Sequence, residues 1–288
     1  MFFNTCAREI LQPEENNHTI GSDTTLDIAT WNIENFPKQS GKTVDYIQAL
    51  VDTMDVDIIA LQEIGDGEYF NTLVSQLSDW NGLRQDDSWG LAYLYKSSIE
   101  VHSIKEISQL DDYNLTRTPL MMEFTWAEEK IYLINNHYKC CGDGIIQNEY
   151  NDEEYRRQQS CILTKNYIDG NLSNENVILV GDLNDELNDP DNHNVFINFI
   201  NDSENYLFVD EDIAFGSEAN WSYPGWPSHL DHILITNELF DNFNKPDAKV
   251  MTVKIEEVLT GGWTEYETYV SDHRPVVVRL VFQNDSSE

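Results

Sequence analysis

Polar side chains stand at the ends of several apolar runs in this sequence, where they could form a site for metal binding or proton transfer. The runs read LDIATW, DIIALQ, IYLINN and VILVG, followed later by HLDHILI and RPVVVRL. A carboxylate beside an apolar run costs free energy unless it is paired or bound to a metal ion. Turn capping explains one such group, whereas repeated placement favours one convergent site. The side chains concerned are Asn32, Glu34, Glu63, His137, Asp182, Asn184, Asp231, Asp272 and His273.

The segment GDLNDELNDPD, which begins at Gly181, alternates acidic and amide side chains in the manner of a calcium-binding EF-hand loop. Such a loop needs a glycine at its sixth position and a glutamate at its twelfth. Leu187 and His193 occupy these positions. The pattern therefore argues against an EF-hand.

The cysteines are Cys6, Cys140, Cys141 and Cys161. They form no CxxC pair, which argues against a structural zinc site. One alternative is a disulfide between Cys161 and either Cys140 or Cys141, which would close a loop of about 20 residues and stabilise the fold by roughly 3 kcal/mol. The other alternative is a set of free thiols, and the sequence leaves both open.

The elements that must position these side chains follow from hydrophobic periodicity and capping signals. The spacing predicts helices over 43–53, 68–77 and 151–168. In the last of these, Asn151 is the expected N-cap, Glu154 lies in the first turn and Gly170 is the expected stop. Alternating or continuous apolar runs predict strands over 26–33, 57–64, 91–95, 99–107, 119–126, 131–137, 177–181, 230–236, 249–257 and 275–282.

Strands and helices run through the whole chain without a break in composition, which predicts a single α/β sandwich with packed sheets in the middle and helices outside. We expect one domain over residues 25–283. Residues 1–24 are expected to be a flexible acidic leader and residues 284–288 a polar tail. Met1-Phe2-Phe3 is too short to be the apolar region of a signal peptide.

The composition excludes several classes of protein. The chain has 288 residues, with 52 acidic against 17 basic side chains and a formal net charge of −35. This charge excludes a broadly basic nucleic-acid coat protein and a polybasic membrane-surface protein. The many aromatic residues argue against disorder, and no apolar run approaches the roughly 20 residues of a membrane span. Either of two alternatives explains the charge: a protein that works in salty surroundings, or an acidic protein that is exported. We expect a soluble, extracytoplasmic or secreted monomer.

Six motifs carry a resemblance to a known family. They are WNIEN (31–35), LQE (61–63), NHYK (136–139), GDLN (181–184), LDHI (230–233) and SDHRP (271–275). In this order they resemble the endonuclease/exonuclease/phosphatase superfamily with the DNase I-like fold, over about residues 25–283. The resemblance implies a four-layer α/β sandwich of two packed, mainly antiparallel sheets flanked by helices. It also implies a hydrolase that needs a divalent metal ion.

The same resemblance implies roles for single residues. Glu63 resembles the metal-binding glutamate, with Asn32, Asp272 and Glu34 as further metal-side groups. Their oxygen atoms suit one catalytic Mg²⁺ or Mn²⁺ ion. His273 resembles the histidine that contacts the scissile phosphate and activates the attacking water.

In the family pattern, Asp231 would orient the imidazole of His273. Asp182 and Asn184 would position the water or the leaving group and bind a phosphate oxygen. These assignments make His273 and Asp231 an acid–base pair of the kind that transfers protons in hydrolysis.

His137 resembles the second histidine of the DNase-like and sphingomyelinase-like branches, a general acid or a phosphate contact, and argues against the abasic-site endonuclease branch, which has tyrosine there. In DNase I an upstream glutamate orients this histidine, but Trp89 falls near that position here. Arg117 and Lys139 are candidate substrate contacts.

Two aromatic loops, over 221–227 and 261–269, flank the late motifs and could stack on bases, meet a lipid interface or anchor the loops. We expect a DNase I-like endonuclease that hydrolyses phosphodiester bonds of nucleic acid by in-line water attack. The alternative is a phosphatase or a sphingomyelinase-like lipid phosphodiesterase. A binding module with a dead site is disfavoured, because no core position of the motifs is replaced.

Overall fold

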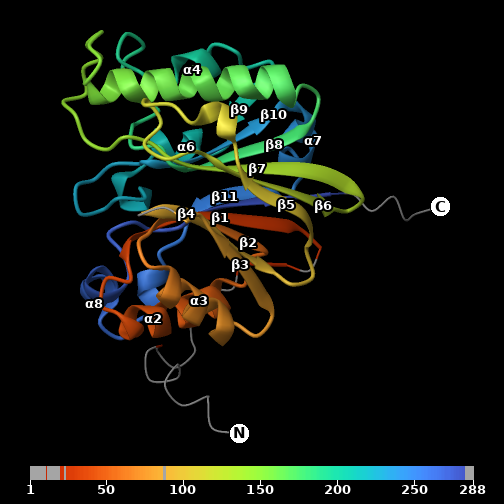
Figure 1. The fold of residues 1–288 in the computed structure, drawn as a ribbon, viewed down its shortest axis with the longest axis vertical. Coiled ribbons are helices and arrows are strands. Elements are labelled where there is room, and N and C mark those ends of the chain that lie inside the picture. Colours follow the sequence, from red (N-terminus) through yellow and green to blue (C-terminus); the bar gives the residue numbers. More distant parts are fainter. Residues whose placement is uncertain (1–10, 12–19, 23, 87–88, 283–288) are drawn as a thin grey trace, which may run out of the picture.

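Two six-stranded sheets form the middle of the molecule (Figure 1). The structure, a computed structural model, describes residues 11, 20–22, 24–86 and 89–282. The first sheet has the strand order β11 (Lys249–Thr252), β12 (Val276–Leu280), β1 (Leu26–Phe36), β2 (Ile58–Ile64), β4 (Gly90–Lys96) and β3 (Trp80–Arg84). The second has the order β5 (Glu100–Glu106), β6 (Leu120–Trp126), β7 (Glu129–His137), β8 (Asn176–Asp182), β10 (Asp231–Thr236) and β9 (Tyr206–Phe208).

Helices cover the outer face of each sheet, which makes a four-layer sandwich (Figure 1). The first sheet is covered by α2 (Gly41–Met54), α3 (Gly67–Gln76) and α8 (Gly262–Tyr269). The second is covered by α4 (Glu153–Asn171), α5 (Ile197–Ile200) and α6 (Glu211–Ala214). The remaining short helices are α7 (Phe240–Phe243), η1 (Ser108–Leu110), η2 (Glu218–Asn220), η3 (Asn237–Leu239) and η4 (Ile255–Val258).

The central strands are apolar on both faces because each face meets a different core. On β1, Ile28 packs between the two sheets, whereas Ala29 and Trp31 pack beneath the helices. On β8, Val180 faces the other sheet and Leu179 faces the helical side. Side chains alternate across a strand, so burial on both sides gives the continuous apolar runs seen in the sequence.

Strand direction brings the polar strand ends to one edge of the sandwich. β1 pairs in parallel with β2, and β7 pairs in parallel with β8. The C-terminal ends of each pair therefore lie together. β12 is antiparallel to β1 and β10 is antiparallel to β8, so both begin at the same edge. All the motifs singled out in the sequence stand at this edge.

The structure confirms the α/β sandwich and corrects the predicted ends of its elements. Asp152, not Asn151, caps α4, because its carboxylate accepts a hydrogen bond from the Tyr155 amide at 2.7 Å. The helix continues through Gly170 to Asn171. The strand expected over 249–257 stops at Thr252 and is followed by η4. The sequence analysis missed β3 and β9, which are short.

Part of the expected leader lies outside the described residues. Of the part that is described, Leu11 pairs with Leu259 across an isolated bridge. Ile20 packs in the core beneath the helices, and its amide donates to the carbonyl of Met54 at 3.0 Å. No helix among the described residues is long and apolar enough to cross a bilayer.

Candidate active site

Asn32 joins the two halves of the site. Its amide nitrogen donates to Glu63 Oε1 at 3.2 Å and to Asp182 Oδ2 at 2.8 Å. Glu63 lies in the first sheet and Asp182 in the second, so this amide bridges the sandwich at its edge. The Asn32 oxygen accepts from the backbone amide of Glu34 at 3.0 Å, which fixes the orientation of the side chain.

A local break in the strand register directs Glu63 towards Asn32. The pairing of β2 with both β1 and β4 shifts at this point, and Glu63 has a φ of 65°. Such bulges re-aim side chains and are common next to active sites. The second carboxylate oxygen accepts from the Asn35 amide at 2.9 Å, so Glu63 is held from two sides.

His273 is paired with a buried aspartate. Its Nδ1 donates to Asp231 Oδ2 at 2.7 Å, and Asp231 is fully buried. The Ser271 hydroxyl accepts from the His273 amide at 2.9 Å and donates to the Asn32 carbonyl at 2.7 Å. The His273 carbonyl accepts from Trp31 Nε1 at 3.3 Å. Both the ring and the backbone of His273 are therefore fixed.

The charges around His273 set its protonation. Although burial alone would lower it, the carboxylates of Asp231, Asp182 and Asp272 raise the pKa of His273 to about 10. Burial raises the pKa of Asp182 to about 7. Burial likewise raises the pKa of Asp272 to about 6, with the Glu34 charge adding to the effect. At neutral pH His273 is thus a cation among carboxylates.

His137 lies on the other side of Asp182. Its Nε2 is 3.5 Å from Asp182 Oδ2, whereas His273 Nε2 is 3.9 Å from the same oxygen. Burial holds the pKa of His137 well below its usual value, and the positive charges of Arg117 and His273 lower it further. Within the described residues its Nδ1 has no hydrogen-bond partner. Trp89 falls near the position expected for a glutamate that would orient this histidine. Its carbonyl accepts a hydrogen bond from Arg117 Nε at 2.5 Å.

Glu63, His137, Asp182 and His273 line one open cavity of about 530 Å³, whereas Asn32 and Asp231 stand outside its lining. The Tyr223 ring lies 4.8 Å from that of His273, centre to centre, and Trp226 is 78% exposed at the rim. None of the described side chains that line the cavity is Lys or Arg. The lining comprises Glu34, Asn35, Glu63, His137, Cys140, Cys141, Gly142, Asp182, Asn184, Tyr223, Trp226, Ser228, Leu230, Asp272 and His273.

The two basic residues expected to contact substrate stand outside this lining. Lys139 Nζ donates to the Cys140 carbonyl at 3.0 Å and lies 3.9 Å from Glu153. Arg117 is held at the Trp89 carbonyl. Glu34 does line the cavity and forms an ion pair with Lys38. The structure thus brings the motifs together around one cavity, whereas Lys139 and Arg117 do not line it.

The donor set fits a hard divalent cation. Glu34, Glu63 and Asp272 line the same cavity, and the crowding of negative charge contributes to the raised pKa values of Asp182 and Asp272. A cation there would relieve that repulsion, and carboxylate and amide oxygens are the ligands that Mg²⁺ and Mn²⁺ take. Glu63 and Asp272, with the Asn32 oxygen nearby, could hold it.

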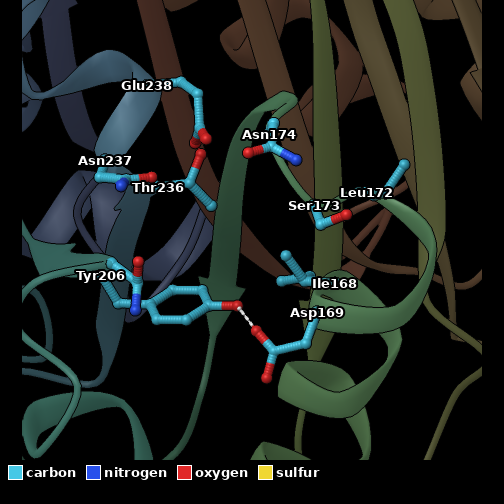
Figure 2. A pocket seen from close by; sticks show the side chains of 10 residues that line it. Ile168, Asp169, Leu172, Ser173, Asn174, Tyr206, Thr236, Asn237 and Glu238 are labelled. Atoms are coloured by element: carbon cyan, nitrogen blue, oxygen red, sulfur yellow. Dashed lines mark hydrogen bonds between the residues drawn. The ribbon is translucent and has the colours of Figure 1, made fainter.

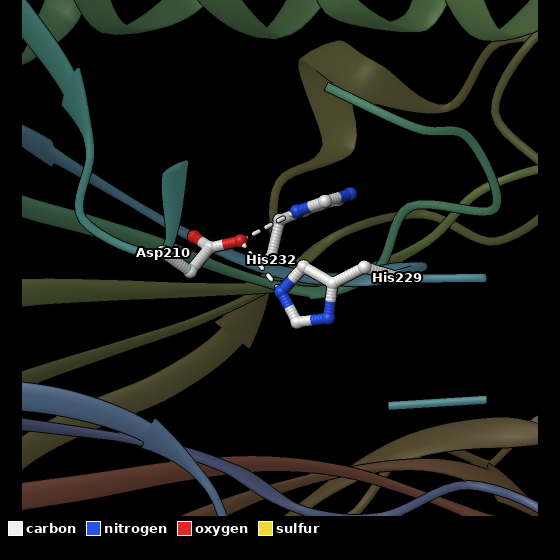
Figure 3. Close-up of side chains that lie close together, drawn as sticks. All are labelled: Asp210, His229 and His232. Carbon is white, nitrogen blue, oxygen red and sulfur yellow. Dashed lines mark hydrogen bonds and ion pairs between the residues drawn. The ribbon is translucent and has the colours of Figure 1, made fainter. Parts of the chain in front are cut away.

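A second cluster, Asp210–His229–His232, supports the site from behind (Figure 3). The Asp210 carboxylate accepts from His232 Nδ1 at 2.6 Å and from His229 Nε2 at 3.1 Å. His232 Nε2 donates to the Asp185 carbonyl at 2.8 Å, so both ring nitrogens carry protons. His232 therefore has no lone pair for a metal ion, and the cluster is a buried ion pair.

This cluster ties together segments that carry site residues. His229 Nδ1 accepts from the Ser222 amide at 3.3 Å, next to Tyr223. His232 follows Asp231 on β10. The sequence analysis missed it, because His229 and His232 of HLDHI are three residues apart, a spacing that places side chains of an extended segment on opposite sides. That spacing alone does not reveal Asp210 as their partner.

A further cavity of about 220 Å³ lies between the end of α4 and the turn after β10 (Figure 2). The Tyr206 hydroxyl donates to Asp169 at 2.5 Å beside it. None of the candidate site residues lines this cavity.

Several solved structures share this architecture. D. rerio TDP2 in complex with a single-strand DNA product superposes with a TM-score of 0.66 at 15% identity, covering 90% of this chain and all of that one. An endonuclease/exonuclease/phosphatase family protein from Bacteroides thetaiotaomicron gives 0.62 at 17% identity, with 90% and 98% covered. A mannosyl-6-phosphatase from the same organism gives 0.60 at 17% identity, with 89% and 100% covered. At these identities the likeness establishes the fold.

No curated protein matches the chain in sequence. A model of the Endonuclease/Exonuclease/phosphatase family matches residues 29–273, which include all six motifs except the last two residues of SDHRP. The chain therefore belongs to the endonuclease/exonuclease/phosphatase family.

Proposed function

We propose that this protein is a divalent-metal-dependent phosphodiesterase and that its substrate is a strand of nucleic acid. The observation that carries the proposal is the bridge from Asn32 to Glu63 and Asp182, flanked by His137 and His273 in one cavity. Family membership supports a phosphoric ester hydrolase. The finer choice of substrate rests on charge and on the aromatic rim.

The charge of the cavity favours a phosphodiester over a phosphomonoester. A diester carries one negative charge at the reacting phosphate, whereas a monoester carries up to about two. The lining supplies carboxylates and one cationic imidazole, and it includes neither Arg117 nor Lys139. Tyr223 and the exposed Trp226 provide faces on which bases can stack, an interaction worth about 1–3 kcal/mol per base. Both features favour a nucleic-acid strand.

We assign the proton chemistry to Asp182 and the charge stabilisation to His273. An imidazolium with a pKa of about 10 keeps its proton at neutral pH, so it donates to a phosphate oxygen instead of accepting a proton from water. Asp182, with a pKa of about 7, is matched to accept that proton. The backbone amide of Asn184 donates to Asp182 Oδ1 at 3.1 Å and so orients the carboxylate.

Asp231 holds the imidazolium in place, because its carboxylate accepts from Nδ1 and leaves Nε2 directed towards Asp182. His137, whose pKa is depressed, is neutral and contacts the phosphate or the leaving group. A bound divalent cation, held by Glu63 and Asp272, supplies Lewis-acid stabilisation of the phosphoryl oxygens.

The test combines a substrate panel with one isosteric variant. Supercoiled plasmid, single-stranded DNA, RNA, sphingomyelin and a sugar phosphate are offered with Mg²⁺ or Mn²⁺. Loss of a ligand to the cation removes several kcal/mol of transition-state stabilisation, so Glu63→Gln should lower the rate about 10²–10³-fold. Glu106→Gln, an exposed change on β5, should leave it unchanged.

Cleavage that persists after exhaustive chelation, or in Glu63→Gln, would contradict the metal assignment. Turnover of sphingomyelin or the sugar phosphate with no cleavage of any nucleic acid would contradict the proposed substrate class.

A further inference from the structure

Two adjacent cysteines, Cys140 and Cys141, form part of the wall of the candidate active site. Both are exposed and free, and both line the cavity that holds His137 and Asp182. Their sulfur atoms are 2.8 Å apart. Non-bonded heavy atoms ordinarily approach to about 3.5–4.0 Å, so the two thiols already face each other at close range.

The backbone around the pair is held in an unusual conformation. Cys141 has a φ of 74°, in the left-handed region that side chains other than glycine seldom adopt. The Arg157 guanidinium donates to the carbonyl of Lys139 at 2.8 Å and to that of Cys141 at 2.6 Å. Arg157 is itself 3% exposed and is held by Asp185 at 2.7 Å. Contacts with α4 and with the loop after β8 thus fix the cysteine turn.

We propose that Cys140 and Cys141 are a dithiol redox site, which a low-molecular-weight disulfide converts reversibly into a vicinal disulfide. In the first step one cysteine thiolate attacks a sulfur of the small disulfide, forms a mixed disulfide and releases one small thiol. The neighbouring thiolate then attacks the cysteine sulfur, forms the Cys140–Cys141 bond and releases the second small thiol. Two electrons pass from the cysteine pair to the oxidant, and both cysteine protons end on the released thiols.

The geometry favours a bond between Cys140 and Cys141 over a bond from either of them to Cys161, the third described cysteine. Cys161 lies on α4, is 1% exposed and packs in the core under that helix. A small disulfide in solution can reach the exposed Cys140 and Cys141, whereas Cys161 is buried. A disulfide between Cys161 and the pair, one alternative left open by the sequence, is not formed in the structure, where all three are free.

Reversibility follows from the chain itself. Neighbouring Cα atoms are about 3.8 Å apart across a trans peptide, whereas most disulfides span about 4.4–6.8 Å between Cα atoms. A bond between neighbours is therefore more easily reduced than an ordinary structural disulfide. Because both residues line the cavity, the redox state changes the wall that a bound molecule meets. The inference stands independently of the proposed function.

Tryptic peptides of the wild-type protein separate the outcomes. Cleavage at Lys139, Arg156, Arg157 and Lys165 places both adjacent cysteines in peptide 140–156 and Cys161 in peptide 158–165. The folded protein is incubated with oxidised glutathione, its remaining thiols are alkylated, and it is digested with trypsin. The masses of the peptides are then measured by mass spectrometry. Cys140→Ser and Cys141→Ser, each with one thiol of the pair left, are the matched variants.

We expect peptide 140–156 to become two hydrogen atoms lighter, to lose both alkylation sites and to regain them after treatment with dithiothreitol. Each serine variant should instead retain glutathione on its remaining cysteine of the pair. This thiol is accessible to the oxidant, but the neighbouring thiol that would displace the glutathione has been removed. A wild-type peptide that stably retains glutathione, that is joined to peptide 158–165, or that stays fully open to alkylation would overturn the proposal.

Discussion

At the residue scale, the protonation of two neighbouring groups decides how the site can work. The His273 ring, surrounded by Asp231, Asp182 and Asp272, has a pKa raised to about 10. Asp182, buried beside it, has a pKa raised to about 7. One side chain therefore stays cationic through the neutral range, while the other changes charge within it. Because their pKa values are pushed apart, the two side chains can take different roles, a fixed cation and a proton acceptor.

The acidic limb of the pH profile tests this assignment. Protonation of Asp182 removes the proposed base, so kcat/KM should fall by about tenfold per pH unit below pH 7 and level off above it. Loss of the His273 proton should lower it again near pH 10. The measurement is kcat/KM against pH at fixed free Mg²⁺.

Asp189 provides the control for that profile, because burial also raises its pKa to about 7 and it does not line the catalytic cavity. In Asp189→Asn, kcat/KM should still fall below pH 7 as it does in the wild type. In Asp182→Asn, the rate should be about 10²–10⁴-fold lower. A profile that is flat through neutrality, or a limb that disappears in Asp189→Asn, would refute the role given to Asp182.

At the scale of elements, the site depends on loops that are held from behind. The Asp210–His229–His232 cluster connects β10 to the loop before it and to the loop after β8. Although burial alone would raise it, the neighbouring histidines hold the pKa of Asp210 below its usual range. Burial opposes and Asp210 favours the protonated form of His232, with the net result that its pKa is raised.

Breaking this pair should be costly. Asp210→Asn leaves His232 buried without its counter-charge, and removal of one partner of a buried ion pair costs about 3–5 kcal/mol. We expect that loss in the free energy of unfolding, measured with urea at neutral pH. Asp247→Asn, an exposed change, should shift it by no more than about 0.5 kcal/mol.

The difference in the free energy of unfolding between wild type and Asp210→Asn should depend on pH with a definite sign. The Asp210 contribution is present above its unfolded pKa of about 3.9 and is lost as the pH falls. The His232 contribution is complete below its unfolded pKa of about 6.5 and is lost as the pH rises through the raised folded value. The gap between wild type and Asp210→Asn should therefore narrow below about pH 4. A gap that widens there would show that a different interaction stabilises the loops.

At the scale of the whole molecule, the charge of −35 opposes the approach of a polyanion. A basic nucleic-acid binder weakens steeply as salt rises, because its phosphate contacts release counterions. Here salt also screens the repulsion between protein and strand, since the Debye length falls to about 10 Å at 0.1 M. These two effects act in opposite directions on the same reaction.

We expect the initial rate of plasmid nicking to hold or rise from low to moderate NaCl at fixed Mg²⁺. A small diester such as bis(p-nitrophenyl) phosphate carries a single charge, so its hydrolysis should respond less to salt and serves as the control. A steep, monotonic fall of the nicking rate from the lowest salt would mean that the global charge does not act at the site.

Much of this architecture could be predicted from the sequence, because local rules determine it. The apolar runs through Ile28 and Val180 predicted buried strands, and polar residues at strand ends predicted a convergent site. The motifs predicted the family, which the match over 29–273 confirms. Short elements such as β3 and β9 were missed, because a few residues carry too little periodicity. The N-cap of α4 was misplaced by one residue, because Asn151 and Asp152 are both good caps.

The tertiary structure alone decided the electrostatics and the partnerships. The cationic state of His273 requires three carboxylates brought together from β8, β10 and the segment before β12. Asp210, in the turn between β9 and α6, meets His232 on β10, and Arg157 reaches the turn that holds Cys140 and Cys141. Burial and distance in three dimensions set pKa values and pairings. Sequence spacing determines neither quantity, so the sequence supplied the chemical groups and the fold determined their states.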